Sequence, residues 1–461
     1  MISKAPNKIK AQDAFDKNGK FQPNSLAVHV SEGVAVGPDG SLWSYQGGVF
    51  RPDPDVIDRR VARVLRNDYT IARGSVVERL VRYMPLTKHL TAEEPEPWCP
   101  LINLRNGVYL WRETDAAERF ASHDPVHRSM IQLPFEYDAG ATCPNFDAWL
   151  YSVLPEEVHG LLWESLGYLL MTGNPLQTAF LLLGREGTGK STFLRVLEKM
   201  LGRENISAES LKSLTENRFA ASSLYGKAAN IVGDIDSSYM DDTSLFLQIT
   251  GGDTMSHERK GKDAFPFRPF AVPVFSTNKV WQSANTSGAY FRRWTILPFD
   301  IQVDRSKPFD EAALHAEVPG IFNKAMNALR ALYYRTEPKQ VFDANGRPTD
   351  EVIQEPARYF EIVGAASEAR ERFARESDPI REWMDADELV YADAGNASYR
   401  VPRSTLYARY AAWCDQNNVG AKSGPKFYTA IRNLGYREFK SNGVMTFEGV
   451  YVYVPSMVGV A

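Results

Sequence analysis

The sequence predicts an α/β protein with an α+β unit before its main core and a compact helical unit with a β-turn after it. The central part of the chain intersperses short apolar runs of strand character with segments that repeat apolar residues at helical spacing. The part before it mixes short β-like runs with a helical stretch. A segment rich in proline separates the core from the final unit.

Composition sets the expected environment of the protein. The 461 residues are enough for several domains, and the net charge of −4 indicates no partner, because a local cluster of Lys and Arg can bind nucleic acid on an acidic protein. Cys99, Cys143 and Cys414 lie far apart without a zinc-ligand or disulfide pattern. With no apolar signal core or membrane span in the sequence, we expect a soluble cytoplasmic protein without a membrane partner.

The N-terminal part divides into a tail and a small domain. Residues 1–24 are polar and rich in Lys, which predicts a flexible tail. Residues 25–147 predict an α+β domain, in which the runs AVHV, LWSY and GVYLW are expected strands and residues 55–66 form an expected helix.

Residues 148–335 predict the main domain. Helical patterning runs from Pro144 to Met171 and returns from about residue 308 to residue 334. The expected strands of the domain are four apolar runs: Thr178–Leu183, Ala228–Gly233, Ala271–Ser276 and Thr295–Phe299.

The C-terminal part predicts a linker and a last domain. Residues 336–360 contain several prolines and an Asn-Gly pair, which favours a linker. In residues 361–461 we expect helices at Ser404–Gln416 and Pro425–Leu434, followed by two strands that reverse at Asn442-Gly443.

A glycine-rich loop joins the first core strand to a helix and fits the pattern G-x-x-x-x-G-K-[ST]. Its backbone N–H groups and the following helix N-terminus predict a binding site for the phosphates of ATP with Mg²⁺. Lys190 would reach the β- and γ-phosphates, and Ser191 would ligate Mg²⁺. The alternative is a structural glycine turn. The expected ATP-binding residues are Gly184, Arg185, Glu186, Gly187, Thr188, Gly189, Lys190, Ser191 and Thr192.

An acidic segment follows the second apolar run of the core. Asp234 and Asp236 are two residues apart, so in an extended chain both carboxylates project to one side. We expect Asp234 to hold the metal ion and Asp236 to polarise the attacking water. The alternative for Asp236 is a role in capping a turn.

A basic segment lies between a Gly-Gly turn and an aromatic strand. Arg259, Lys260 and Lys262 place three cations within four residues, which predicts a contact to DNA phosphates. The alternative is a solvated charged loop. His257 is counted among the candidate DNA contacts, and the alternative for it is a bystander role.

The C-terminal domain has a second basic segment, with Lys426, Arg432 and Lys440 as its expected DNA contacts. Two helices followed by a basic β-turn indicate a winged helix, whose second helix enters a major groove. Such units also dock proteins, so both roles stay open. Its expected small core is formed by Tyr407, Trp413, Phe427 and Leu434.

The order of these motifs resembles the superfamily 3 helicases. The similarity is strongest to the helicase part of phage and plasmid primase-helicases, which are related to poxvirus primase-helicases. It covers roughly residues 95–330 and is weaker in the C-terminal domain. The matching text runs LTENRFAASSLYGKAANIVGDID, ITGGDTMSHERKGKDAFPF, PVFSTNKV and AYFRRWTILPF.

The resemblance implies further roles. The core would be an AAA+-like P-loop ATPase, and the N-terminal domain a helical collar. Asn278 matches the sensor that bonds the γ-phosphate or water, or else lies in a turn. Arg292 and Arg293 match the arginine finger supplied by the next subunit, and which of them acts is open, since one of them could instead form an intersubunit salt bridge.

The expected function is that of an ATP-dependent, ring-forming replicative DNA helicase of a phage or mobile element, translocating on single-stranded or forked DNA in the host cytoplasm. The ring would be a homo-hexamer. Too few residues precede the matched region for a primase domain, so a separate primase is an expected partner. The alternatives are an ATP-regulated replication initiator that binds an origin and a ring NTPase that remodels protein.

Overall fold

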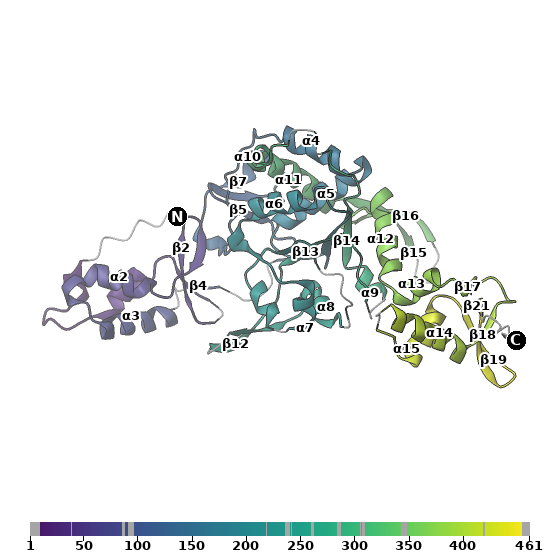
Figure 1. The fold of residues 1–461 in the computed structure, drawn as a ribbon. Helices are drawn as coiled ribbons and strands as arrows, with labels where there is room; N and C mark the ends of the chain where they lie inside the picture. The colour runs from purple at the N-terminus through teal and green to yellow at the C-terminus, as the bar shows by residue number, and fades with distance from the viewer. Residues whose placement is uncertain are drawn as a thin grey trace.

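The computed structural model describes residues 10–37, 39–84, 88–90, 96–217, 219–235, 240, 242–259, 262–283, 287–304, 306, 309–342, 348–417 and 420–453. Within these ranges, no helix combines the length and apolar character needed to cross a membrane. Figure 1 shows a small N-terminal unit on one side of a central core and a C-terminal unit on the other.

The N-terminal unit packs three helices on one face of a four-stranded sheet of order β3-β2-β1-β4. The run AVHV, expected as a strand, lies instead in α1, because Pro23 starts that helix and its buried residues recur at helical spacing. The unit contains η1 (Ala11–Ala14), α1 (Pro23–Val30), β1 (Val34–Val36), β2 (Leu42–Gln46), β3 (Val49–Pro52), α2 (Val56–Leu65), α3 (Ile71–Tyr83) and β4 (Lys88–His89).

Two predictions for this unit need correction or extension. Residues 10–24 of the expected tail are ordered, because Ala14 is buried against the helices and the chain forms a bridge between Phe15 and Phe21. The helix α3 was not predicted, whereas α2 and β2 confirm the expected helix at residues 55–66 and the strand LWSY.

Residues 98–143 share the hydrophobic core of the main domain, so the predicted domain of 25–147 spans two structural units. Their strands are β5 (Leu101–Leu104), β6 (Gly107–Leu110) and β7 (Phe120–Ala121), and β6 confirms the run GVYLW. The side chains of Ile102, Tyr109 and Trp111 pack with three helices, α4 (Pro144–Val153), α5 (Glu156–Leu170) and α11 (Val318–Tyr334).

The core sheet has five parallel strands in the order β14-β8-β13-β10-β9. Its strands are almost wholly buried and read as continuous apolar runs, as expected when both faces are covered. The four predicted core strands are confirmed to within about a residue at each end. The strands are β8 (Ala179–Leu183), β9 (Ile206–Ser207), β10 (Ala229–Val232), β13 (Val272–Thr277) and β14 (Trp294–Pro298).

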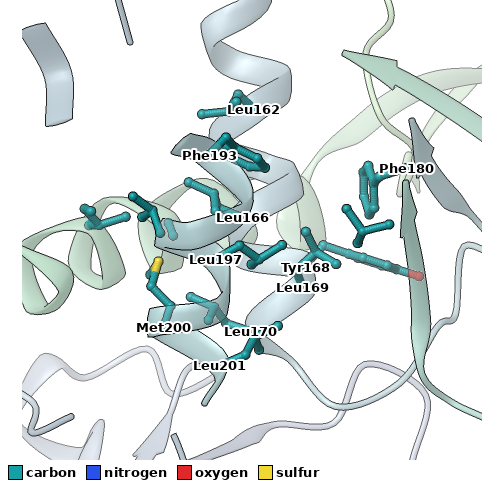
Figure 2. Close-up of a cluster of buried hydrophobic side chains, with 14 of the residues drawn as sticks. Leu162, Leu166, Tyr168, Leu169, Leu170, Phe180, Phe193, Leu197, Met200 and Leu201 are labelled. Carbon is teal, nitrogen blue, oxygen red and sulfur yellow. The ribbon is translucent and has the colours of Figure 1, made fainter. Parts of the chain in front are cut away.

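Helix α6 (Lys190–Leu201) follows β8 and packs against α5. Figure 2 shows Phe193 and Leu197 of α6 facing Leu166 of α5. These buried positions recur every three or four residues, and each such side chain contributes about 1.5–3 kcal/mol on burial. This packing fixes the start of α6 beside the end of β8.

The remaining elements of the core are shorter. The helical patterning expected at 308–334 is split into α10 and α11. A hairpin of β11 and β12 extends from the core and is seen at its lower edge in Figure 1. The elements are α7 (Leu211–Glu216), η6 (Ala220–Leu224), α8 (Ser244–Gly251), β11 (Met255–Arg259), β12 (Lys262–Phe267), α9 (Gly288–Phe291) and α10 (Glu311–Ala316).

The predicted linker contains a β-hairpin whose register shifts between Gln340 and Phe342. Strands β15 (Thr336–Phe342) and β16 (Pro348–Pro356) pair antiparallel, with Pro338 opposite Gln354. Prolines fit here because both strands of an isolated hairpin are edges, where a missing N–H costs no ladder bond. The prolines that suggested a linker therefore lie in edge strands.

Helix α12 (Gly364–Glu376) packs on β14 of the core through Ala369 and Phe373. The core of the C-terminal unit begins only at Ile380, so packing places the division near residue 377 and not at residue 361. The proline and glycine residues of the hairpin led us to expect the domain boundary there. The buried face of α12 shows that this helix still belongs to the core.

The C-terminal unit contains the two predicted helices and the predicted strand pair. Asn442 and Gly443 both have positive φ, as a tight hairpin turn requires. Phe427 is buried in the core, while Tyr407, Trp413 and Leu434 lie half-buried at its edge. The elements are α13 (Pro379–Ala386), β17 (Val390–Ala392), β18 (Arg400–Pro402), α14 (Arg403–Gln416), α15 (Gly424–Asn433), β19 (Arg437–Ser441), β20 (Val444–Glu448) and β21 (Val450–Val452).

Candidate nucleotide site and nucleic-acid interface

The loop between β8 and α6 has a backbone that only glycine fits at three positions. A Cβ atom at Gly184 would lie 1.9 Å from the carbonyl oxygen of Phe299. Gly187 and Gly189 have φ of 73° and 97°, in the left-handed region. The spacing of the glycines therefore matches the geometry of the loop, which curls around the start of α6.

Lys190 lies buried above this loop. Its Nζ donates hydrogen bonds to the carbonyl oxygens of Gly184 and Arg185, each at 2.6 Å. Burial lowers the pKa of Lys190, and the carboxylates of Asp234, Glu186 and Asp300 oppose that shift. An anion at the loop would therefore meet a cation that is held in place and only partly solvated.

The first turn of α6 completes the loop. Ser191 is exposed, and the hydroxyl of Thr192 accepts a hydrogen bond from Arg195 at 3.3 Å. Thr188 folds back onto the loop, its hydroxyl donating to the carbonyl oxygen of Arg185 at 2.8 Å. With the amino end of a twelve-residue helix beside it, the loop has the dipole, N–H groups and lysine that a phosphate chain needs.

Asp234 and Asn278 lie at the same carboxyl edge of the sheet as the loop. β13 pairs with β8 so that Thr277 is opposite Leu183, which places Asn278 beside Gly184. Asp234 follows β10 on the next strand, and its backbone N–H donates to the Ser276 hydroxyl at 3.1 Å. Both side chains are exposed. Ligands of open α/β sheets bind at this edge.

Asp234 has a φ of 48°, an uncommon value for a residue with a side chain. The chain turns sharply there, directly after the strand. Asp236 lies outside the described residues, so its role stays a prediction.

The segment after β14 braces the loop and was not predicted to do so. The side-chain amide of Gln302 and the backbone N–H of Val303 donate to the carbonyl oxygen of Gly187 at 3.2 and 3.0 Å. Asp300 adds a carboxylate near Lys190. Their position just past the carboxyl end of a core strand is the one signal that could have indicated them.

Arg292 and Arg293 lie at the opposite, amino edge of the sheet, just before β14. Arg293 is 8% exposed, and its Nη1 donates to the side-chain and backbone oxygens of Gln177 at 2.5 and 3.2 Å. Arg292 is exposed and has no side-chain hydrogen bond or ion pair within the described residues. The two adjacent arginines therefore differ: one is fixed inside its own chain, and the other faces outward.

The β11–β12 hairpin carries the predicted basic segment. The backbone of Arg259 and Lys262 is paired near its end, but their side chains and the whole of Lys260 lie outside the described residues. His257 is 7% exposed and packs with Tyr225 and Phe265, at ring separations of 5.1 and 4.7 Å. The burial of its ring at the base of the hairpin favours the bystander alternative for His257 over a contact to DNA.

The predicted DNA contacts of the C-terminal unit are exposed but not equivalent. Lys426 on α15 and Lys440 on β19 are exposed without an ion pair in the described part of the chain. Arg432 is paired with Glu438, which also meets Arg403 at 3.4 Å. A phosphate would have to displace that carboxylate from Arg432.

Among solved structures, the C-terminal region of NrS-1 is similar to this chain. Its apo A form has a TM-score of 0.47 at 12% identity, covering 94% of this chain and 99% of that chain. A second apo structure of the region also has a TM-score of 0.47 at 12% identity, covering 93% of this chain and 99% of that chain.

Two family models match parts of the chain. The model described as "D5 N terminal like" matches residues 34–155, which end between α4 and α5. The model described as "Family of unknown function (DUF5906)" matches residues 182–293, from the end of β8 to the arginine pair. The chain thus combines two regions that are typical of phage and plasmid primase-helicase proteins.

Proposed function

We propose that this chain is an ATP-hydrolysing DNA helicase with a superfamily 3, AAA+-like core, which assembles into a ring and translocates on single-stranded DNA during replication. The main support for this proposal is that charged and polar groups lie at two opposite edges of one sheet. A phosphate loop, a carboxylate and an amide meet at the carboxyl edge, and an exposed arginine lies at the amino edge. The two matched families support a role in DNA replication.

In this proposal, the residues at the carboxyl edge bind ATP and Mg²⁺. Lys190 exchanges its bonds to the loop carbonyls for the β- and γ-phosphates. Ser191 and Asp234 hold Mg²⁺, which neutralises charge on the phosphates. Asn278 bonds the γ-phosphate or the attacking water. Asp236 polarises that water.

The arginine at the amino edge requires a second subunit. Arg292 lies in the turn before β14, and the extended strand from Trp294 to Pro298, the residue paired with Leu183 beside the loop, spans about 13 Å on its own. No arginine side chain spans that distance, so Arg292 cannot reach the nucleotide of its own chain. A neighbouring copy in a closed ring can receive it. The geometry favours Arg292 as the finger because Arg293 is held by Gln177.

The hairpin provides the coupling to DNA. It lies in sequence between Asp234 and Asn278, and its base packs on Tyr225 just before β10. A shift at the γ-phosphate can therefore tilt the hairpin, whose basic end grips the DNA backbone. The alanine variant of Lys260 should lose DNA-stimulated hydrolysis and unwinding, and wild-type rates in this variant would refute the role of the hairpin.

The proposed function is tested by unwinding of a forked duplex of arbitrary sequence. The wild-type protein should separate the strands with ATP and Mg²⁺. Lys190→Ala should lose hydrolysis and unwinding but still bind single-stranded DNA. If the wild-type protein hydrolyses ATP without any stimulation by DNA and does not unwind the fork, the helicase proposal is wrong.

One feature favours a second candidate, a replication initiator that recognises an origin. The exposed Lys426 lies on α15 and the exposed Lys440 on β19, next to the hairpin turn, in a unit with the order of a winged helix. An initiator would bind one DNA sequence far more tightly than others. A comparison of binding to origin fragments and to random duplex separates the two functions.

A further inference from the structure

A groove of about 330 Å³ lies between the N-terminal sheet and the core, outside the nucleotide site. One wall is formed by Trp43 of β2 and Arg51 of β3. The other is formed by Tyr225 and Lys227, which connect η6 to β10. Trp43, Arg51 and Lys227 have no role in the site described above, whereas Tyr225 also packs against the base of the β11–β12 hairpin.

The N-terminal sheet explains why aromatic side chains line this groove. Residues alternate between the two faces of β2, so Leu42 and Ser44 are buried on one side while Trp43 is half-buried on the other. Trp43 packs partly with Phe50 in a small cluster of that second face. The rest of its ring is available to a ligand in the groove.

Two cations share the groove with the aromatic rings. Lys227 is half-buried, its Nζ donates to the carbonyl oxygen of Glu204 at 2.7 Å, and burial lowers its pKa. A lysine ammonium has three donors, so this one can still bind an anion. Arg51 approaches Glu204 at 3.8 Å in a pair whose side chains are 35% and 48% exposed. Such a loose and solvent-screened pair is weak, so Arg51 can exchange it for a phosphate.

The acidic groups of the groove are already engaged. Asp39 accepts hydrogen bonds from the backbone N–H and hydroxyl of Ser41, at 3.0 and 2.5 Å. Glu204 faces Arg51. The groove also contains His257, which lies at the base of the β11–β12 hairpin, so it is continuous with the proposed DNA-gripping element.

We propose that this groove is a second binding subsite for single-stranded DNA, in which Trp43 and Tyr225 stack on a base while Arg51 and Lys227 bind its phosphate. Aromatic faces combined with cations are the chemistry that binds single strands without regard to sequence. The inference rests on the proposed function, because the strand would reach the groove from the hairpin.

The test is the salt dependence of binding to a fluorescent oligothymidylate, measured by anisotropy with the full chain and a non-hydrolysable ATP analogue. Arg51→Gln and Lys227→Gln should each weaken binding several-fold and reduce the slope of log affinity against log salt by about 0.7. Trp43→Leu should weaken binding about 10-fold without changing the slope. Lys199→Gln, an exposed lysine of α6, is the matched control and should change neither.

A cross-linking experiment on the unaltered protein guards against variants that misfold. An oligonucleotide with 5-iodo-deoxyuridine should form a photo-crosslink in a peptide containing Trp43 or Tyr225. Unchanged slopes in both cation variants, or cross-links that avoid both aromatic residues, would overturn the subsite while leaving the helicase proposal standing. A wild-type protein that does not bind single-stranded DNA would overturn both.

Discussion

At the scale of single residues, the glycine-rich loop between β8 and α6 shows how a sequence motif and local geometry correspond. Gly184 lies against the backbone of Phe299, so its lack of a side chain is a requirement of packing as well as of the turn. The sequence indicated the glycine spacing, but not the contact with a segment more than a hundred residues later. Residues that act through such contacts, including Gln302, have no local pattern to reveal them.

The importance of this close approach can be tested by adding one methyl group at Gly184. Gly184→Ala should displace the loop from Phe299 and reduce ATP binding and hydrolysis at least about 100-fold, because a 1.9 Å contact with backbone cannot be relieved by a side-chain rotation. Nucleotide affinity and steady-state hydrolysis measure this.

Gly160→Ala is the matched control. Gly160 lies in α5 with no atom within 4 Å of an added Cβ, so the change should stabilise the protein by about 0.5–1 kcal/mol and leave hydrolysis intact. Normal ATP hydrolysis in Gly184→Ala would show that the loop does not need this close approach.

At the scale of elements, apolar patterning predicted the core strands well because a strand buried on both faces is a continuous apolar run. Prediction from apolar patterning failed in segments whose local sequence fits more than one type of secondary structure. AVHV alternates only weakly and became helical once Pro23 fixed its first turn. The proline-rich hairpin β15–β16 imitated a linker, because its described side chains are mostly exposed.

Asp53 connects several elements of the N-terminal unit. It is 8% exposed, accepts a hydrogen bond from Ser44 of β2 at 2.8 Å, and accepts two from Arg59 of α2 at 2.9 and 2.7 Å. These bonds, chiefly those from Arg59, lower the pKa of Asp53. A lowered carboxyl pKa stabilises the folded state above the unfolded pKa of about 3.9 and ceases to do so as pH falls through the folded value.

Asp53→Asn should therefore destabilise the protein by about 1–2 kcal/mol at neutral pH, and the difference from wild type should shrink below about pH 4. Thermal unfolding at several pH values measures both quantities. A difference that stays constant down to about pH 2 would mean that the carboxylate charge does not stabilise this unit.

At the scale of the whole molecule, the two ends of the chain have different relations to the core. Residues 98–143 and α12 complete the hydrophobic core of the main domain, although the sequence placed both in neighbouring units. The C-terminal unit from α13 onward has a core of its own. Long-range burial decides such boundaries, and local composition does not report it.

A chain that ends after residue 377 should therefore stay folded and hydrolyse ATP, whereas a chain that ends after residue 360 should not. The second truncation removes Phe373 from the core beside Trp281 and Trp294, and loss of one such ring costs about 3–5 kcal/mol. Circular dichroism and hydrolysis assays compare the two. If both truncated chains folded and hydrolysed ATP equally well, α12 would not be needed for the stability or activity of the core.

In the proposed ring, each catalytic site is shared between two copies of the chain, with Lys190 from one and Arg292 from the next. Hydrolysis by Lys190→Ala, Arg292→Ala and an equal mixture of the two variants tests it directly. Each variant alone should be inactive. The mixture should recover up to about a quarter of the wild-type rate, because one in four random interfaces joins an intact loop to an intact arginine. A mixture as inactive as its parts, or an Arg292→Ala protein that hydrolyses ATP at the wild-type rate, would contradict the shared site.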